Sequence, residues 1–220
     1  MKYILIDLDG TITDPKLGIT KSIQYALKAF NIPVQDLDSL CKFIGPPLRT
    51  SFMEEYGFDE VKTEEAIAKY REYFAVTGLY ENVVYYGMEE LLSKLKRAGK
   101  TLIVATSKPE IFAQRILDHF GLSKYFDGIC GATLDHSRGT KEEVIRYALE
   151  RHNIREHSQV VMVGDRLHDI EGAKSVGIAS IGVLYGYGSK EELEEAGADR
   201  IAATVEELYE VIMDFSAHNC

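Results

Sequence analysis

Short apolar runs alternate with amphipathic segments along most of this chain. The first run begins after Lys2, is rich in Ile and Leu and ends at Asp7, which is typical of a strand buried on both faces of a sheet. Similar runs predict strands at Thr101–Ala105, Ile129–Ala132, Val160–Val163 and Ser180–Leu184. Helical spacing of apolar residues predicts helices at Glu89–Ala98, Pro109–Phe120 and Thr140–His152. This alternation predicts an α/β fold with a doubly wound parallel sheet.

The stretch from about residue 14 to residue 82 interrupts the alternation, because its apolar residues follow helical spacing alone. Ile19, Ile23 and Leu27 share one face of a predicted helix, and Gly45-Pro46-Pro47 separates the helical segments. We therefore expect a helical insertion at 14–82, while 1–13 and 83–220 form the sheet domain. Open α/β folds bind ligands beyond the carboxyl ends of their strands, and we expect the insertion to lie over that edge.

Charge and cysteine content narrow the classes of function. The formal net charge of −10 argues against nonspecific binding to nucleic acid or to an anionic membrane. No apolar stretch approaches the ~20 residues that cross a bilayer, and the first strand follows Met1 too closely to leave room for a signal peptide. Cys41, Cys130 and Cys220 lack metal-ligand spacing and fit reduced thiols. We expect a cytoplasmic protein that binds neither nucleic acid nor membrane.

Two carboxylates follow the first strand. Asp7 and Asp9 leave the same face of it, roughly 7 Å apart at Cα, because side chains alternate along a strand. Two unpaired carboxylates at a buried strand end repel each other, and a divalent cation would remove that penalty. The pair therefore predicts a metal site, with a nucleophile beside an acid/base.

Hydroxyls and a lysine follow later segments. Thr106 and Ser107 precede the helix predicted at Pro109, whose free N–H groups favour an anion; capping of the helix by Ser107 is the alternative. Lys141 lies in the first turn of the next predicted helix, where a positive charge opposes the helix dipole. An anion bound there would explain Lys141, although a solvated surface lysine is the alternative.

Another pair of carboxylates follows the strand at Val160–Val163. Asp165 stands at the strand end, and Asp169 comes four residues later, within reach of the same side. Asp7, Asp9 and Asp165 together would provide the oxygen ligands that suit Mg²⁺. In the alternative interpretation, Asp165 is a turn residue and Asp169 caps a helix.

The order of these segments resembles the four signature motifs of the haloacid dehalogenase-like (HAD) superfamily. The motifs are Asp7-x-Asp9-Gly10-Thr11, then Thr106-Ser107, then Lys141, then Gly164-Asp165-x-x-x-Asp169. The helical insertion resembles the type C1 cap of the phosphoglycolate-phosphatase-like branch. The resemblance spans Tyr3 to about Phe215 and implies a HAD core with an inserted all-helical cap.

The resemblance also implies a role for each motif. Asp7 would attack phosphorus to form an aspartyl-phosphate, and Asp9 would protonate the leaving alcohol and then activate water. Mg²⁺ would be bound by Asp7, Asp165 and the backbone carbonyl of Asp9, with Asp169 as a ligand or supporting acceptor. The residues expected to bind the phosphoryl group are Gly10, Thr11, Thr106, Ser107 and Lys141. The implied activity is a Mg²⁺-dependent phosphatase of a small phosphorylated metabolite, such as phosphoglycolate, a nucleoside monophosphate or pyrophosphate.

Three positions refine this expectation. Asp9 favours phosphoryl transfer, because the dehalogenase members of the superfamily lack an acid there. Glu142 stands where relatives often have proline, which makes Lys108 the alternative to Lys141. Arg49 in the insertion would contact a carboxylate or second phosphate of the substrate, or else is a solvated residue in a helix's first turn.

Other functions remain open at this point. A sugar phosphomutase would use the same nucleophile and return the phosphoryl group to the substrate. A glycosidase with two carboxylates would explain Asp7 and Asp9 but leave Lys141 and Asp165 unused. A non-catalytic regulator would keep the fold without the activity, and a receiver-type phospho-acceptor would not need the insertion. The oligomeric state is not indicated by the sequence.

Overall fold

The chain divides into two compact units, which we call the sheet unit (residues 1–14 and 84–220) and the helical unit (residues 15–83). The computed structural model describes residues 1–135 and 137–217. Cys41 and Cys130 form no disulfide, and Cys220 lies outside the described residues.

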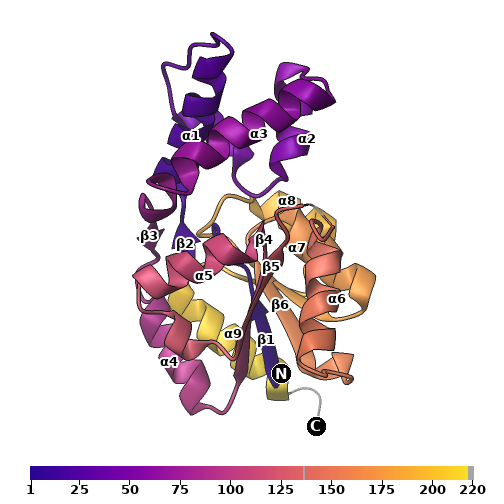
Figure 1. Cartoon of the computed structure of the whole chain (residues 1–220). Helices are drawn as coiled ribbons and strands as arrows, with labels where there is room; N and C mark the ends of the chain where they lie inside the picture. The colour runs from indigo at the N-terminus through magenta and orange to yellow at the C-terminus, as the bar shows by residue number, and fades with distance from the viewer. Residues whose placement is uncertain (136, 218–220) are drawn as a thin grey trace. The chain divides into compact units, whose positions relative to one another are not determined.

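The sheet unit is built on parallel strands in the order β5-β4-β1-β6-β7-β8 (Figure 1). The strands are β1 (Tyr3–Ile6), β4 (Thr101–Pro109), β5 (Gly128–Ala132), β6 (Val160–Gly164), β7 (Ala179–Val183) and β8 (Arg200–Ala202). The predicted doubly wound parallel sheet is therefore confirmed. The sequence analysis missed β8, because a strand of 3 residues is too short to show a periodic pattern.

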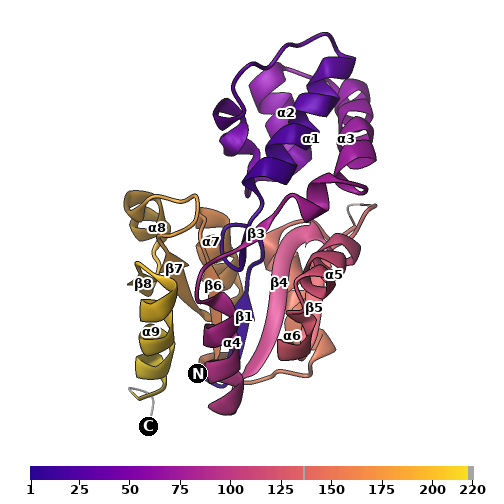
Figure 2. The same cartoon turned by 90° about the vertical axis from the view of Figure 1, so that its left-hand side faces the viewer.

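Helices cover both faces of this sheet. They are α4 (Met88–Arg97), α5 (Glu110–His119), α6 (Lys141–Arg151), α7 (Leu167–Val176), α8 (Lys190–Ala196) and α9 (Val205–Ala217), with short 3-10 turns η3 (Ser123–Tyr125) and η4 (His157–Gln159). Helices α6 and α7 lie on one face, and α4, α5 and α9 lie on the other (Figures 1 and 2). Leu5 and Met162 from the strands pack with Val144 and Ala148 of α6 in a fully buried core. This packing fixes where α6 and α7 begin relative to the strand ends.

The strand order reverses direction at β1. The chain passes from β1 to β4 and β5 on one side, and then to β6, β7 and β8 on the other. Such a switch point leaves a crevice at the carboxyl ends of the strands, and open α/β folds bind ligands there. Asp7 directly follows β1 at this point.

The predicted end of the strand at Thr101–Ala105 is wrong. The strand predicted at Thr101–Ala105 continues to Pro109, so Ser107 lies inside β4 rather than at a helix start. Helix α5 begins at Glu110, with Pro109 as its N-cap and no side-chain cap. Ser107 therefore does not cap α5, and the binding of an anion by Thr106 and Ser107 stays a prediction.

The helical unit contains α1 (Lys16–Ala29), η1 (Asp38–Phe43), α2 (Leu48–Tyr56), α3 (Glu60–Phe74) and η2 (Gly78–Tyr80). The helices expected on each side of Gly45-Pro46-Pro47 are present. The aromatic residues at helical spacing form its core: Phe52 packs on Phe43, and Tyr70 packs on Phe74. Two short strands, β2 (Thr13–Asp14) and β3 (Val83–Val84), pair where the chain passes between the units.

Across the described parts of the chain, every helix is too short or too polar to span a bilayer.

Candidate active site

Three predicted site residues lie where neighbouring strands end. Asp7 follows β1, Thr106 lies near the end of β4, and Asp165 follows β6. Strands β4 and β6 flank β1 on its two sides, so these residues come to one point of the sheet edge. Their exposed fractions are 7%, 2% and 1%, respectively. The structure thus gathers polar side chains in a buried position, where each needs a partner.

The turn after β1 brings Gly10 against Asp165. Gly10 has a φ of +77°, and a Cβ at this position would lie 2.1 Å from Oδ2 of Asp165. Both the backbone conformation and the close approach therefore require glycine. Thr11, the next residue, is fully buried, and its Oγ1 makes a long contact of 3.5 Å with Oδ1 of Asp165.

Asp165 is held by backbone from two loops. Besides the turn at Gly10, the N–H of Tyr187 donates to Oδ2 of Asp165 at 2.8 Å. Burial raises the pKa of Asp165 well above its usual value, and the nearby charges of Asp169 and Asp7 raise it further. An ionised Asp165 is therefore costly unless a cation joins the site.

Lys141 connects two carboxylates at the start of α6. Its Nζ lies 2.9 Å from Oδ1 of Asp7 and 2.7 Å from Oδ1 of Asp169, and it donates to the Ala105 carbonyl at 3.1 Å. Burial alone would lower the pKa of Lys141, but the charges of Asp169 and Asp7 together raise it. Lys141 is therefore a buried cation, and the alternative of a solvated surface lysine is wrong. A capping box between Thr140 and Glu143 starts this helix.

Asp169 lies in the first turn of α7 and has two kinds of partner. Its carboxylate accepts the N–H of Arg166 at 3.2 Å and also pairs with Lys141. It packs so closely on Gly164 that a Cβ there would lie 2.1 Å from Cγ of Asp169. Burial raises its pKa, while Lys141 opposes the rise. The helix-cap interpretation of Asp169 is therefore confirmed, and its role toward a metal stays a prediction.

Asp9 pairs with a different lysine. Oδ2 of Asp9 lies 2.7 Å from Nζ of Lys108, whose side chain is only 4% exposed. Burial raises the pKa of Asp9, and Lys108 offsets part of that rise. The structure thus places both Lys108 and Lys141 among the carboxylates: Lys108 pairs with Asp9, and Lys141 pairs with Asp7 and Asp169.

The site fits a divalent cation. Carboxylate oxygens of Asp7, Asp165 and Asp169 lie within 4.8 Å of one another, and all three residues are buried. Carboxylate oxygens are the ligands that Mg²⁺ prefers. Burial, followed by the charges of neighbouring carboxylates, raises the pKa values of Asp165 and Asp169, and a bound cation would stabilise their ionised forms. The side chain of Asp9 is not part of this cluster, which leaves its backbone carbonyl as the predicted ligand atom.

Ser107 and Arg49 have other surroundings among the described residues. Ser107 is half-buried in β4, next to the buried Thr106. Arg49 lies in the helical unit, in the first turn of α2, where it forms an ion pair with Glu64. Its contact with a substrate stays a prediction.

The structure also explains residues that the sequence analysis did not interpret. Arg166 forms an ion pair with Glu192 at 2.8 Å, and Glu192 also accepts the N–H of Leu167 at 2.8 Å. This contact joins α8 to the start of α7, next to Asp165. At the start of α8, Ser189 accepts the N–H of Glu192, while the Glu192 carboxylate accepts a hydrogen bond from Arg166. The contact of Tyr187 with Asp165 was not predicted. The two glycines of Tyr185-Gly-Tyr-Gly188, which follow a strand, are the signal that could have indicated a loop in close contact with its neighbours.

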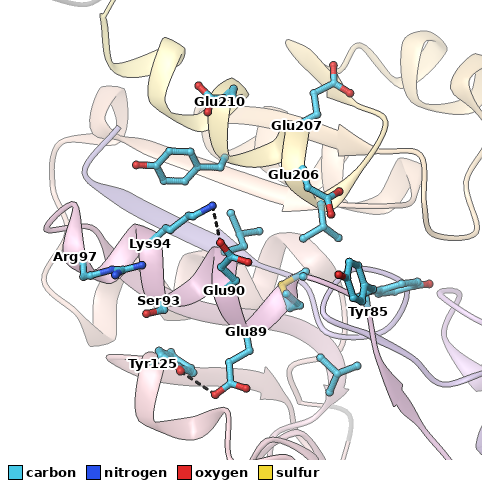
Figure 3. A pocket seen from close by; sticks show the side chains of 17 residues that line it. Tyr85, Glu89, Glu90, Ser93, Lys94, Arg97, Tyr125, Glu206, Glu207 and Glu210 are labelled. Atoms are coloured by element: carbon cyan, nitrogen blue, oxygen red, sulfur yellow. Dashed lines mark hydrogen bonds and ion pairs between the residues drawn. The ribbon is translucent and has the colours of Figure 1, made fainter.

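A hollow of about 950 Å³ lies elsewhere in the sheet unit (Figure 3). Helices α4 and α9 line it, and its polar groups include Glu89 and Glu90. Glu89 accepts from the Tyr125 hydroxyl at 2.9 Å, and Lys94 pairs with Glu90 at 2.8 Å. None of the predicted site residues line this hollow.

Comparisons with known proteins agree with the geometry of the strand-end site. The haloacid dehalogenase-like hydrolase family matches residues 4–183. A 5'-nucleotidase of Pseudomonas aeruginosa is 49% identical over 210 residues, covering 95% of this chain and 94% of the relative. The tyrosine-protein kinase PtkA of Mycobacterium tuberculosis is 39% identical over 214 residues, covering 96% of this chain and 72% of the kinase.

A solved structure is similar over nearly the whole chain. The crystal structure of a predicted phosphatase from Clostridium acetobutylicum has 54% sequence identity and a TM-score of 0.94, and the match covers 96% of this chain and 98% of that one. The order of the motifs, their convergence at one sheet edge and these matches together show that the chain belongs to the haloacid dehalogenase-like hydrolase family.

Proposed function

We propose that this chain is a Mg²⁺-dependent phosphatase that hydrolyses a small phosphorylated metabolite through an aspartyl-phosphate on Asp7. One observation carries the proposal. The buried carboxylates of Asp7, Asp165 and Asp169 cluster within 4.8 Å, while Asp9, two residues after Asp7, is held apart from them by its own lysine. A nucleophile beside a cation site and a separate acid/base is what phosphate monoester hydrolysis requires.

In the first half-reaction, a carboxylate oxygen of Asp7 forms a bond to phosphorus as the bond to the leaving oxygen breaks. The electron pair stays on the leaving oxygen, which takes a proton from Asp9. In the second half-reaction, Asp9 takes a proton from water, whose oxygen attacks the same phosphorus and releases phosphate and Asp7. Each residue returns to its starting protonation state, so the cycle balances.

Lys141 and Mg²⁺ counter the negative charge of the substrate. Lys141 contacts Asp7 and Asp169, so its charge lies next to the attacking group. When bound by Asp7, Asp165 and the carbonyl of Asp9, with support from Asp169, Mg²⁺ supplies a positive charge that lowers the repulsion between carboxylate and phosphate. Thr106, Ser107 and the turn at Gly10 are proposed to bind phosphoryl oxygens.

The helical unit is proposed to be the C1 cap that the motif resemblance implies. The substrate classes to test follow from the relatives and from the motif resemblance: nucleoside 5'-monophosphates, phosphoglycolate, sugar phosphates and pyrophosphate. The relative named 5'-nucleotidase is the reason to test nucleoside monophosphates first.

Phosphate release from this panel tests the proposal. We expect release from at least one member with Mg²⁺, and loss of release when EDTA removes the metal. The control is Asp7→Asn, which keeps the size of the side chain but removes the nucleophile. No release from any substrate by the wild-type chain would contradict the proposal and favour a non-catalytic regulator.

A transferase is the second candidate, because the relative named a tyrosine-protein kinase is similar over 96% of this chain. Asp7 would be phosphorylated in the same way, but an acceptor other than water would take the phosphoryl group. A sugar phosphomutase belongs to the same class. Slow loss of the aspartyl-phosphate in water, together with rapid loss when a sugar phosphate or a tyrosine peptide is added, would favour the transferase.

A further inference from the structure

Lys108 is a buried cation next to the proposed acid/base. Its Nζ lies 2.7 Å from Oδ2 of Asp9, and the two side chains are 4% and 14% exposed. Lys141 does not substitute for it, because Lys141 pairs with Asp7 and Asp169. The two lysines thus have different partners: Lys141 contacts the proposed nucleophile Asp7, and Lys108 contacts Asp9.

The extended end of β4 explains how Lys108 reaches the site. Thr106 and Lys108 are both buried, whereas Ser107 between them is half-buried, as expected for alternation along a strand. The N–H of Lys108 donates to Oγ1 of Thr106 at 3.2 Å, which ties the lysine backbone to that threonine. The register of β4 against β5 shifts between Thr106 and Pro109, so the regular pairing is interrupted at Lys108. The position of Lys108 is therefore set by the end of β4 and by its contact with Thr106.

The two oxygens of Asp9 have different surroundings. Oδ2 is held by Lys108, whereas Oδ1 is buried and has no hydrogen-bond partner in the part of the chain that the structure describes. A buried carboxyl oxygen without a partner is costly, so its persistence indicates that a ligand completes it. The leaving oxygen of the substrate, or the attacking water, is the partner that the proposed mechanism provides.

We propose that Lys108 is a positioning residue, which holds Asp9 through Oδ2 so that Oδ1 exchanges the proton with the leaving oxygen. This inference rests on the proposed phosphatase function. The step is the proton transfer already described: Oδ1–H gives its proton to the leaving oxygen while the phosphorus–oxygen bond breaks and the bond to Asp7 forms. Lys108 gains and loses nothing in this step.

A comparison of leaving groups tests the inference. The alcohol of the best alkyl phosphate from the substrate panel needs a proton, whereas the phenolate of 2,4-dinitrophenyl phosphate does not. We expect Lys108→Met to lower the first-turnover rate about 100-fold with the alkyl phosphate and less than about 5-fold with the dinitrophenyl ester, since general acid catalysis contributes about 10²–10⁴-fold. Both rates come from one protein sample, so the folded fraction cancels in their ratio.

Two variants serve as controls. Lys108→Arg retains a cation and is expected to keep the ratio of the two rates within about tenfold of wild type. Lys124→Met removes an exposed lysine that pairs with Glu89 at 3.0 Å, and it is expected to change neither rate.

The outcomes separate the inference from the proposed function. Equal losses with both substrates, or no loss with either, in Lys108→Met would overturn the role of Lys108 while leaving the phosphatase intact. If wild-type enzyme hydrolyses neither ester, or if Asp7→Asn hydrolyses both at wild-type rates, the proposed function itself fails.

Discussion

Asp7 and Asp9 are two residues apart, yet their side chains enter different environments. Asp7 belongs to the carboxylate cluster with Asp165 and Asp169 and also contacts Lys141 at 2.9 Å. Asp9 pairs with Lys108 outside that cluster. Under the proposed function, Asp7 meets the phosphoryl group beside the cation, and Asp9 exchanges the proton while Lys108 holds its other oxygen.

Replacing the nucleophile tests this division. We expect Asp7→Asn to lower phosphate release by at least about 10³-fold, because an amide forms no stable bond to phosphorus under these conditions. The measurement is steady-state phosphate release with Mg²⁺ on the best substrate. Asp36→Asn, at an exposed position of the helical unit, is the matched control. A rate near that of wild type in Asp7→Asn would exclude Asp7 as the nucleophile.

Replacing the acid/base is expected to stop the cycle halfway. Asp9→Asn still presents Asp7 to an ester with a good leaving group, such as p-nitrophenyl phosphate, but no carboxylate removes a proton from water. The phosphorylated chain should therefore accumulate and be visible by intact mass spectrometry. The double variant Asp7→Asn/Asp9→Asn is the control. An adduct on the double variant, or none on Asp9→Asn, would refute the assigned roles.

At the scale of elements, loops hold the carboxylate side chains that follow the strands. The turn after β1 places Gly10 against Asp165, and the loop after β7 places the N–H of Tyr187 on the same carboxylate. Helix α7 begins with Asp169 in its first turn, and the ion pair of Arg166 with Glu192 holds α8 beside that turn. The position of Asp165 is thus fixed by backbone from loops that are distant in sequence.

The close turn at Gly10 gives a prediction for metal binding. Gly10→Ala would place a methyl group 2.1 Å from Oδ2 of Asp165, at a φ of +77°. We expect Asp165 to shift and the rise in Tm on adding Mg²⁺ to shrink by more than half. The matched control is Gly99→Ala, which has a φ of +74° and no atom within 4 Å. Both variants lose about 1–2 kcal/mol from backbone strain, and the clash adds to the loss in Gly10→Ala. The comparison therefore uses the rise in Tm that Mg²⁺ causes within each variant.

If Gly10→Ala and Gly99→Ala responded equally to Mg²⁺, the contact between Gly10 and Asp165 would have no part in metal binding. Thermal unfolding with and without Mg²⁺, monitored by circular dichroism, measures this difference.

At the scale of the whole molecule, the site costs stability when no cation is bound. Burial raises the pKa of Asp165, and it also raises the pKa of Asp169 despite Lys141. A carboxyl group with a raised folded pKa stabilises the fold fully below its unfolded pKa, near 4, and this contribution is lost as the pH rises through the folded pKa. The metal-free protein therefore becomes less stable as the pH rises from about 4 through the folded pKa of Asp169, about 6.

Mg²⁺ binding should reverse that loss, because it binds the ionised carboxylates of the folded chain alone. We expect the rise in Tm with Mg²⁺ to be larger at about pH 8 than at about pH 5, by several degrees. Asp165→Asn should remove most of the rise at the higher pH. An equal response at both pH values would mean that the ionisation of these carboxylates does not govern metal binding.

The sequence by itself determined the sheet and the identity of its central carboxylates. Short apolar runs predict strands well, because a strand that is buried on both faces of a sheet needs apolar residues at consecutive positions. Asp7 and Asp165 follow such runs, and the parallel strand rule brings their ends to one edge. Lys141 was marked by its conflict with the helix dipole, which is a local property.

Only the tertiary structure decided which side chains meet. Lys108 pairs with Asp9, and Glu192 with Arg166, across long separations in the chain. The spacing of residues along a strand gives the face of a side chain, but its partner depends on how far each neighbouring strand extends and in which register. Strand β4 continues to Pro109, although the apolar pattern ends at Ala105. This extension places Lys108 at the site and puts Ser107 inside the strand, not at the start of a helix.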